Sequence, residues 1–275
     1  MDETGAPAPA TKTRLWRRHP VGFVAATLVG LVLALLIAAA AGAWWALRSE
    51  RGSAWLLAAL PGVQVEAPQG RLLGDFAARR VTIHLPGSAD TVTLTGLAWR
   101  GLRVQRAAAP QWASVTLDAL AAERVDLQLG PSKNTGPMQA PADLALPIAL
   151  DLRALRIGEL HANALGAQPI RELVAQLQLG ANQGAEHRIG AFSLGWDRLQ
   201  ISGAAQIASA APMALAAQVA LRQQAEGALP GWSANAALTG PLAAPVLQAT
   251  LRAAPSPQHP AQALDARATL RPFAA

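Results

Sequence analysis

An uninterrupted apolar run from Val21 to Leu47 constrains this chain more than any other feature. The run contains no charged residue, and Thr27 supplies its only hydroxyl group. As a helix it would be roughly 40 Å long at about 1.5 Å per residue. That length exceeds the hydrocarbon core of a bilayer, which is about 30 Å thick. We therefore predict a transmembrane signal anchor over residues 21–47.

A cleaved signal peptide is the alternative interpretation, because Ala38–Ala40 and Ala41–Ala43 supply small residues of the kind found at cleavage sites. The apolar region of a signal peptide is only about 7–15 residues long, however, and this run is much longer. Trp44 and Trp45 also stand where aromatic side chains lie at a membrane interface. Length and aromatic residues both favour an uncleaved anchor.

Basic residues are more numerous before the run than directly after it. Those before it are Lys12, Arg14, Arg17 and Arg18, and those after it are Arg48 and Arg51. Positive charge is retained on the cytoplasmic side, so residues 1–20 are predicted to be a cytoplasmic tail. The remaining bulk would be periplasmic, on a protein that crosses the inner membrane once. The absence of cysteine is compatible with that compartment but does not decide it.

Residues 48–62 are expected to form a short juxtamembrane helix, which Pro61-Gly62 ends. Trp55 in this helix is a third candidate for the membrane interface, with Trp44 and Trp45.

Short stretches of alternating apolar and polar residues follow from Val63 onward, and Gly or Pro interrupts them. This period-two pattern is typical of half-buried β-strands. The connections are too short for helical crossovers, so neighbouring strands should be antiparallel. A loop rich in Pro, Gly and Asn at 130–147 is expected to interrupt the series. The predicted strands include 81–85, 91–94, 114–117, 124–129, 171–179, 198–201, 215–221, 232–238, 246–251 and 264–270.

The sequence contains few features that would indicate an enzyme. The five histidines are isolated, without a second ligand at the spacing of a zinc site. No nucleophile elbow, phosphate-binding loop or pair of carboxylates is recognisable. The net charge of +6 comes from scattered arginines without an aromatic platform, which does not favour nucleic-acid binding. We expect no enzyme activity, no metal, no cofactor and no nucleic-acid partner.

The predicted strands share an apolar face that almost no helix is available to cover. A second sheet, a closed barrel or a molecule that is not protein would have to cover it. Packing in an ordinary core is one explanation, at about 1.5–3 kcal/mol for each large aliphatic side chain that is fully buried. A groove for acyl chains is the other. The candidate groove residues are Val81, Ile83, Leu85, Val92, Leu94, Val115, Leu117, Val125, Leu127 and Leu129.

Three stretches resemble the beginning of the TamB family of translocation and assembly module subunits. These are Trp55-Leu56-Leu57-Ala58-Ala59-Leu60-Pro61-Gly62-Val63, Gly70-Arg71-Leu72-Leu73-Gly74-Asp75-Phe76 and Leu97-Ala98-Trp99-Arg100. The stretch Leu238-Thr239-Gly240-Pro241-Leu242-Ala243-Ala244-Pro245-Val246 is similar to the recurrent strand-turn unit of that group. The family belongs with the AsmA-like, bridge-forming lipid-transfer proteins. The resemblance covers about residues 12–130 well and the remainder only in style.

This resemblance implies a mainly β fold in which residues 63–275 form an elongated antiparallel sheet, curled into an open U-shaped trough. It implies an inner-membrane protein that carries phospholipids towards the outer membrane or assists the assembly of outer-membrane β-barrels. A TamA-like barrel would be its partner, through a C-terminal region that this sequence does not contain. Lipids would enter near residues 55–76. The alternative is an anchored periplasmic β-sandwich that acts as an adaptor, binding proteins without lipid.

Overall fold

The computed structural model describes residues 45–85, 89–130, 141–225, 231–255 and 260–273. The chain divides into two compact units, 1–45 and 46–275, and the second contains the sheet. The predicted cytoplasmic tail, the predicted anchor up to residue 44 and Trp44 lie outside the described residues. In the described part of the chain, no helix combines the length and the apolar character needed to cross a membrane.

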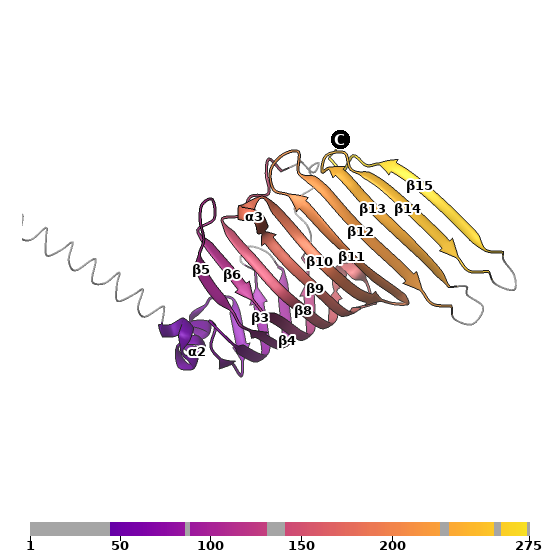
Figure 1. The fold of residues 1–275 in the computed structure, drawn as a ribbon. Coiled ribbons are helices and arrows are strands. Elements are labelled where there is room, and N and C mark those ends of the chain that lie inside the picture. Colours follow the sequence, from indigo (N-terminus) through magenta and orange to yellow (C-terminus); the bar gives the residue numbers. More distant parts are fainter. Residues whose placement is uncertain (1–44, 86–88, 131–140, 226–230, 256–259, 274–275) are drawn as a thin grey trace, which may run out of the picture. The chain divides into compact units, whose positions relative to one another are not determined.

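The described residues are mainly β, with few helices (Figure 1). Residues 45–48 are helical, and the further helical elements are α2 (Glu50–Ala59), the 3-10 turn η1 (Asn163–Leu165) and α3 (Ala181–Gly184). The strands are β1 (Val63–Glu66), β2 (Gln69–Gly70), β3 (Phe76–His84), β4 (Thr91–Arg100), β5 (Arg103–Arg106), β6 (Ala113–Leu117), β7 (Ala119–Gln128), β8 (Ile148–Ala162), β9 (Ile170–Gly180), β10 (Glu186–Trp196), β11 (Leu199–Ala208), β12 (Ala214–Gln223), β13 (Trp232–Pro241), β14 (Val246–Ala253) and β15 (Gln262–Thr269).

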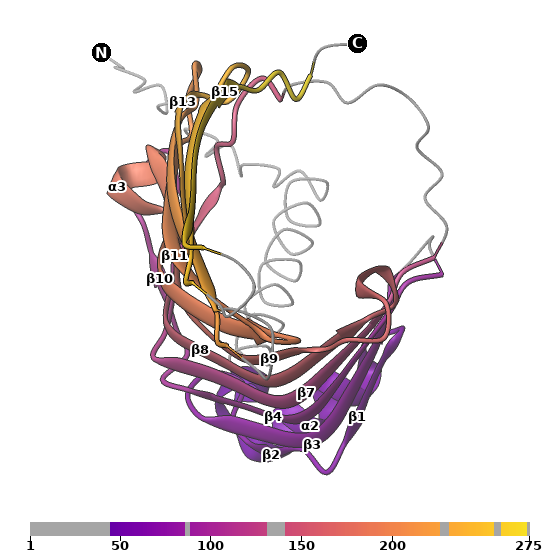
Figure 2. The same ribbon diagram turned by 90° about the vertical axis from the view of Figure 1, so that its right-hand side faces the viewer.

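Within the described residues, these strands form one fifteen-stranded sheet. Its main path runs β1-β3-β4-β7-β8-β9-β10-β11-β12-β13-β14-β15, with β2, β5 and β6 attached at its sides. The sheet is open and does not close into a barrel. Figure 2 shows that it is also curved, with one concave and one convex face. The described part is therefore a single layer and not the two packed sheets of the β-sandwich alternative.

One strand departs from the expected antiparallel order. β8 runs parallel to both β6 and β7, although it is antiparallel to β9. A parallel neighbour requires a long connection that brings the chain back to the same end of the sheet. Residues 129–147 make that connection, and they coincide with the loop expected at 130–147, of which 131–140 lie outside the described residues. The expectation of antiparallel neighbours was thus wrong at β8.

The sequence around helix α2 contains residues that favour both the start and the end of a helix. The hydroxyl of the N-cap residue Ser49 accepts a hydrogen bond from the Gly52 N–H at 3.1 Å, and Glu50 lies in the first turn. Pro61 and Gly62 follow the last turn, and Gly62 adopts a φ of 77°. The observed helix therefore lies within the predicted range 48–62.

An irregular row crosses β3, β4, β7 and β8 at the same level. On β3 the apolar positions are Phe76 and Ala78, then Val81 and Ile83, so the spacing increases by one residue. Regular pairing is interrupted in the neighbouring strands at Gly96, Glu123 and Gly158. A Cβ atom at Gly158 would lie only 2.6 Å from the backbone oxygen of Glu123, so this position requires glycine. At this irregular row the alternation of side chains shifts by one residue in each strand, so the apolar side chains on both sides of the row lie on the same face.

The best buried core of the sheet lies at its β1–β4 end. Phe76, Ala78, Val81 and Leu97 form a buried cluster there. The rings of Phe76 and Trp99 stack with their centroids 4.3 Å apart. Leu57 of α2 packs against the same cluster, so this helix belongs to the fold of the sheet.

Candidate functional site

Apolar side chains form continuous rows across the sheet, perpendicular to the strands. One row runs through Val65, Val81, Leu94, Val125, Leu160 and Ile170, which are paired in register across six strands. A second runs through Leu117, Leu152, Leu177, Ile189, Ala205, Ala217, Leu238, Leu247 and Ala268, across nine strands. Strands lie about 4.8 Å apart, so the second row extends over roughly 40 Å. We call the face that carries these rows the apolar face.

The structure brings eight of the ten candidate groove residues together on this face. Val81, Leu94 and Val125 lie in the first row, and Ile83, Val92 and Leu127 form a parallel row beside it. Val115 and Leu117 lie on β6, in register with Leu150 and Leu152 of β8.

Leu85 and Leu129, the other two candidates, lie just beyond the ends of β3 and β7. The Leu85 N–H donates to the Asp90 carbonyl at 3.1 Å, and the Leu129 N–H donates to Asn163 Oδ1 at 3.1 Å. Their backbones thus belong to the rim where strands turn, and the side chains are exposed.

Much of the apolar face was missed by the sequence reasoning. β8 contributes Leu152, Leu155, Ile157 and Leu160, but two irregularities in its pairing break the simple alternation that would have identified them. β11–β14 contribute Ile201, Leu221, Leu238, Leu247 and Leu251. These residues do alternate with polar ones, so the periodicity of the strands predicted there was sufficient to find them.

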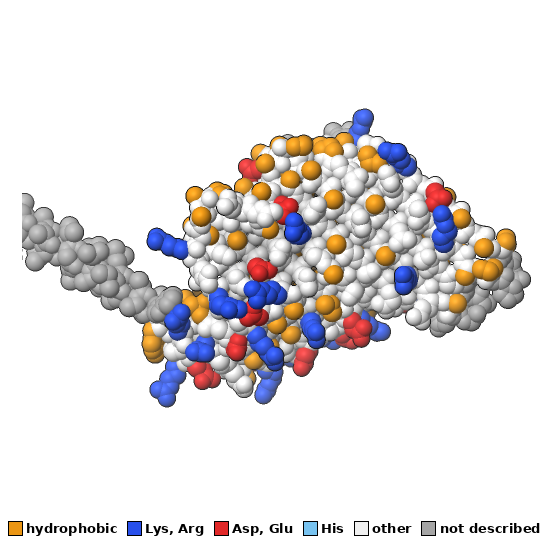
Figure 3. Space-filling model, in the orientation of Figure 1, with side chains coloured by type: hydrophobic (Ala, Val, Ile, Leu, Met, Phe, Trp, Pro, Cys, Tyr) orange, Lys and Arg blue, Asp and Glu red, His pale blue; other side chains and the backbone are white. Residues whose placement is uncertain are grey.

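The opposite, polar face is the convex one, and Figure 3 shows its charged side chains. Arg103 Nη2 lies 2.6 Å from Asp118 Oδ2, and Arg153 Nη1 lies 2.9 Å from Asp118 Oδ1. A row of register neighbours on this face reads Glu66, Arg80, Thr95, Arg124, Glu159 and Arg171. Charged neighbours of opposite sign favour one strand register over a slipped one.

Two carboxylates on the polar face are held in their ionised form. The hydrogen bond from the Arg124 side chain lowers the pKa of Asp126, and the charge of Arg124 adds to this effect. A hydrogen bond with His161 likewise lowers the pKa of Glu159. The two faces therefore differ in charge, because these charged groups point away from the rows of aliphatic side chains.

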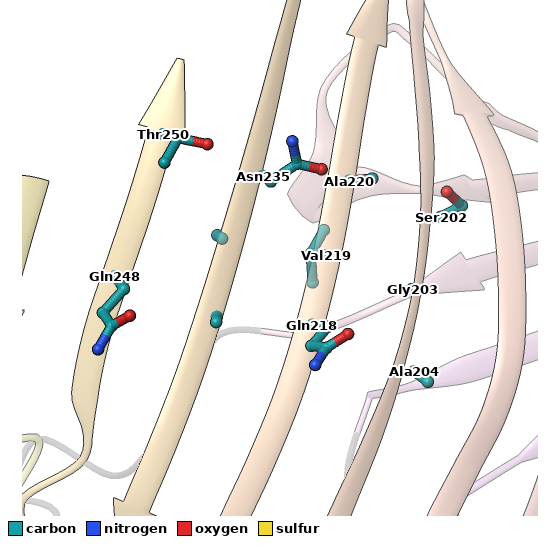
Figure 4. A pocket seen from close by; sticks show the side chains of 11 residues that line it. Ser202, Gly203, Ala204, Gln218, Val219, Ala220, Asn235, Gln248 and Thr250 are labelled. Carbon is teal, nitrogen blue, oxygen red and sulfur yellow. The ribbon is translucent and has the colours of Figure 1, made fainter. Parts of the chain in front are cut away.

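A shallow depression of about 420 Å³ lies on the polar face between β11 and β14 (Figure 4). Uncharged polar side chains, such as Gln218 and Asn235, line it together with small apolar ones, such as Ala220 and Ala237. Its polar side chains lie across the sheet from the apolar rows, because they alternate with Val219, Ala236 and Ala249, although Val219 and Ala236 also border the hollow. The hollow is therefore not part of the candidate groove.

Two of the predicted membrane-interface residues can be placed. Trp45 is 58% exposed and Trp55 is 67% exposed, which is unusual for tryptophan in water. On α2, Ser53 and Leu57 face the sheet and Trp55 points away from it.

Among the described residues, no group of three or more His, Cys, Asp or Glu side chains is arranged to hold a metal ion. Comparison of the chain with protein-family models, curated proteins and solved structures finds no match. The function is therefore inferred from the residues and their geometry.

Proposed function

We propose that the sheet is an open trough whose apolar face holds the acyl chains of phospholipids. The single observation that carries this proposal is the extent of the apolar rows, which cross up to nine strands; Leu117 and Leu152 at the start of the longest row are buried, but its members on the described strands β10–β15 are not. A contiguous apolar surface of that size normally marks a binding site in a soluble domain. Acyl chains require non-directional contact and little else.

The shape of the surface supports the same proposal. A face that is concave and lined by Leu, Val and Ile contacts a flexible chain along its whole length, and the convex face keeps the charged groups in water. The apolar residues of β11–β14 are only half-buried within the protein, so they retain surface for a ligand.

The wider role follows from the sequence features. From the membrane anchor predicted at residues 21–47 and from the family resemblance, we propose that the protein belongs to the TamB-like bridge-forming lipid-transfer proteins. It would then carry phospholipids between the inner and outer membranes, or assist outer-membrane β-barrel assembly with a TamA-like partner. It would act without enzymatic chemistry or a cofactor. Exposed Trp45 and Trp55 suit a position at the inner-membrane interface.

Native mass spectrometry of fragment 46–275, purified without detergent, tests the lipid proposal. The fragment should begin at 46, because Ser53 and Leu57 pack against the sheet and a cut after residue 61 would remove them. We expect phospholipid to remain bound and to be released when the fragment is denatured. A lipid-free fragment that is fully folded would contradict the groove and favour the adaptor that binds only proteins.

A further inference from the structure

The apolar face is covered at one end of the sheet. Over the buried cluster of Phe76, Ala78, Val81 and Leu97 lie Leu57 from α2 and Leu72 from the segment between β2 and β3. Phe76 is only 5% exposed and Ala78 only 4%. These side chains have no free surface for a ligand, although they lie on the same face as the groove residues.

Helix α2 and the covering segment are bound to each other by hydrogen bonds. The Leu72 N–H donates to Ser53 Oγ at 3.1 Å, and this hydroxyl donates to the Ala46 carbonyl at 3.0 Å. The Leu73 N–H donates to the Leu47 carbonyl at 2.9 Å. Ser53 is only 1% exposed, so breaking these bonds without a substitute would leave buried polar groups unpaired.

The same segment is bound to the sheet on its other side. Trp99 Nε1 donates to the Leu72 carbonyl at 3.1 Å. The Gly101 N–H donates to Asp75 Oδ1 at 2.8 Å, and the Leu102 N–H donates to the Gly74 carbonyl at 2.9 Å. Residues 71–75 are therefore fixed between the helix and the end of β4, as a structural part of the fold.

The β10–β15 end of the sheet is more exposed to solvent than the β1–β4 end. No residue within the described strands β10–β15 is buried, and Leu264 on β15 is 60% exposed. β3, β4 and β7–β9, by contrast, each contain buried positions. Free apolar surface thus increases along the sheet away from α2.

We propose that α2 and residues 71–75 form an end plug that closes the groove over β1–β4. A lipid then reaches the apolar face through the open side of the sheet, over β10–β15, and not near residues 55–76 as the sequence reasoning placed it. This inference rests on the proposed lipid function, and it identifies which part of the face is available to lipid.

Single cysteines test the plug, because the natural chain contains none. Ala78→Cys places a thiol under the plug, Ala249→Cys places one on the open apolar face, and Ala237→Cys places one on the polar face. Each full-length variant is reconstituted into vesicles containing a phospholipid with a maleimide at the end of one acyl chain. We expect Ala249→Cys to react and the other two to react at least about tenfold more slowly, since Ala78 requires local opening.

The outcomes separate the plug from the lipid function. Equal reaction at positions 78 and 249 would overturn the plug and leave the lipid groove intact. No reaction at either position would remove the lipid groove and the plug with it. As a control, a soluble maleimide must label both thiols in denaturant, which shows that both can react when they are accessible.

An opening variant checks that the named contacts close this end. Leu57→Ala with Leu72→Ala in the Ala78→Cys background removes the two covering side chains. Reaction of position 78 with the lipid should then approach that of Ala249→Cys. A folded triple variant in which position 78 stays unreactive would overturn the role given to α2 and residues 71–75.

Discussion

Replacing Phe76 by alanine should lower the free energy of unfolding by about 3–5 kcal/mol, the usual cost of truncating a buried aromatic side chain. Phe76 lies in the buried cluster at the β1–β4 end and stacks on Trp99. Its loss leaves a cavity beneath Leu57 and Leu72, because both ends of the covering segment are fixed by hydrogen bonds. The midpoint of urea unfolding, followed by tryptophan fluorescence in fragment 46–275, measures the effect.

Trp112→Ala is the matched control for that substitution. Trp112 is also a large aromatic residue, but it is 67% exposed, with buried Gln111 and Ala113 on either side. Its truncation should change stability by no more than about 0.5 kcal/mol. Equal effects of the two substitutions would show that the core is not at the β1–β4 end.

Charged residues on the open apolar face should abolish lipid binding without unfolding the sheet. Ile201, Leu221 and Leu251 lie in one cross-strand row and are half-buried. The triple variant Ile201→Glu, Leu221→Lys, Leu251→Glu places opposite charges on the adjacent strands β11 and β12, with the second glutamate two strands further along on β14, which limits repulsion. An acyl chain on this row would have to remove those charges from water. We expect bound phospholipid to fall at least about tenfold, a change of about 1.4 kcal/mol or more.

The polar face supplies a control with the same charges. Ser202→Glu, Ala220→Lys, Thr250→Glu alters the neighbouring positions, whose side chains point to the opposite side of the sheet. This variant should retain lipid. Equal loss in both variants would mean that charge on the sheet, and not the apolar face, determines binding. Thermal unfolding of both variants shows whether either loss reflects misfolding.

The sequence was sufficient to predict a mainly β protein, because alternation and Gly or Pro breaks are local signals. It identified strands such as 215–221 and 246–251, which lie within β12 and β14. It did not reveal β8 as a strand or its parallel pairing. The apolar residues of β8 are spaced by two and by three, since its register with β9 shifts between Leu152 and Leu155 and its pairing with β7 is interrupted at Gly158. Which strands pair across residues 129–147 depends on distant contacts that a local pattern does not contain.

The sequence was sufficient to predict that the candidate site is aliphatic, but not which part of the apolar face is free and which part is covered. Val81 and Leu94 were found from alternation alone, yet the structure shows them in or against the core cluster. Alternation indicates which residues share a face, but not what covers that face. The covering by Leu57 and Leu72 depends on a helix and a segment that carry no strand pattern themselves.

Photo-crosslinking of lipid along β11 and β12 tests most directly whether the apolar face holds lipid. A benzophenone amino acid is introduced in turn at Gln200, Ile201, Ser202 and Leu221 of the full-length protein in living cells. After illumination, phospholipid adducts are identified by mass spectrometry. Because successive side chains of a strand point to opposite faces, adducts should appear at Ile201 and Leu221 and be absent at Gln200 and Ser202. Equal labelling of both faces, or none at Ile201 and Leu221, would contradict the lipid trough.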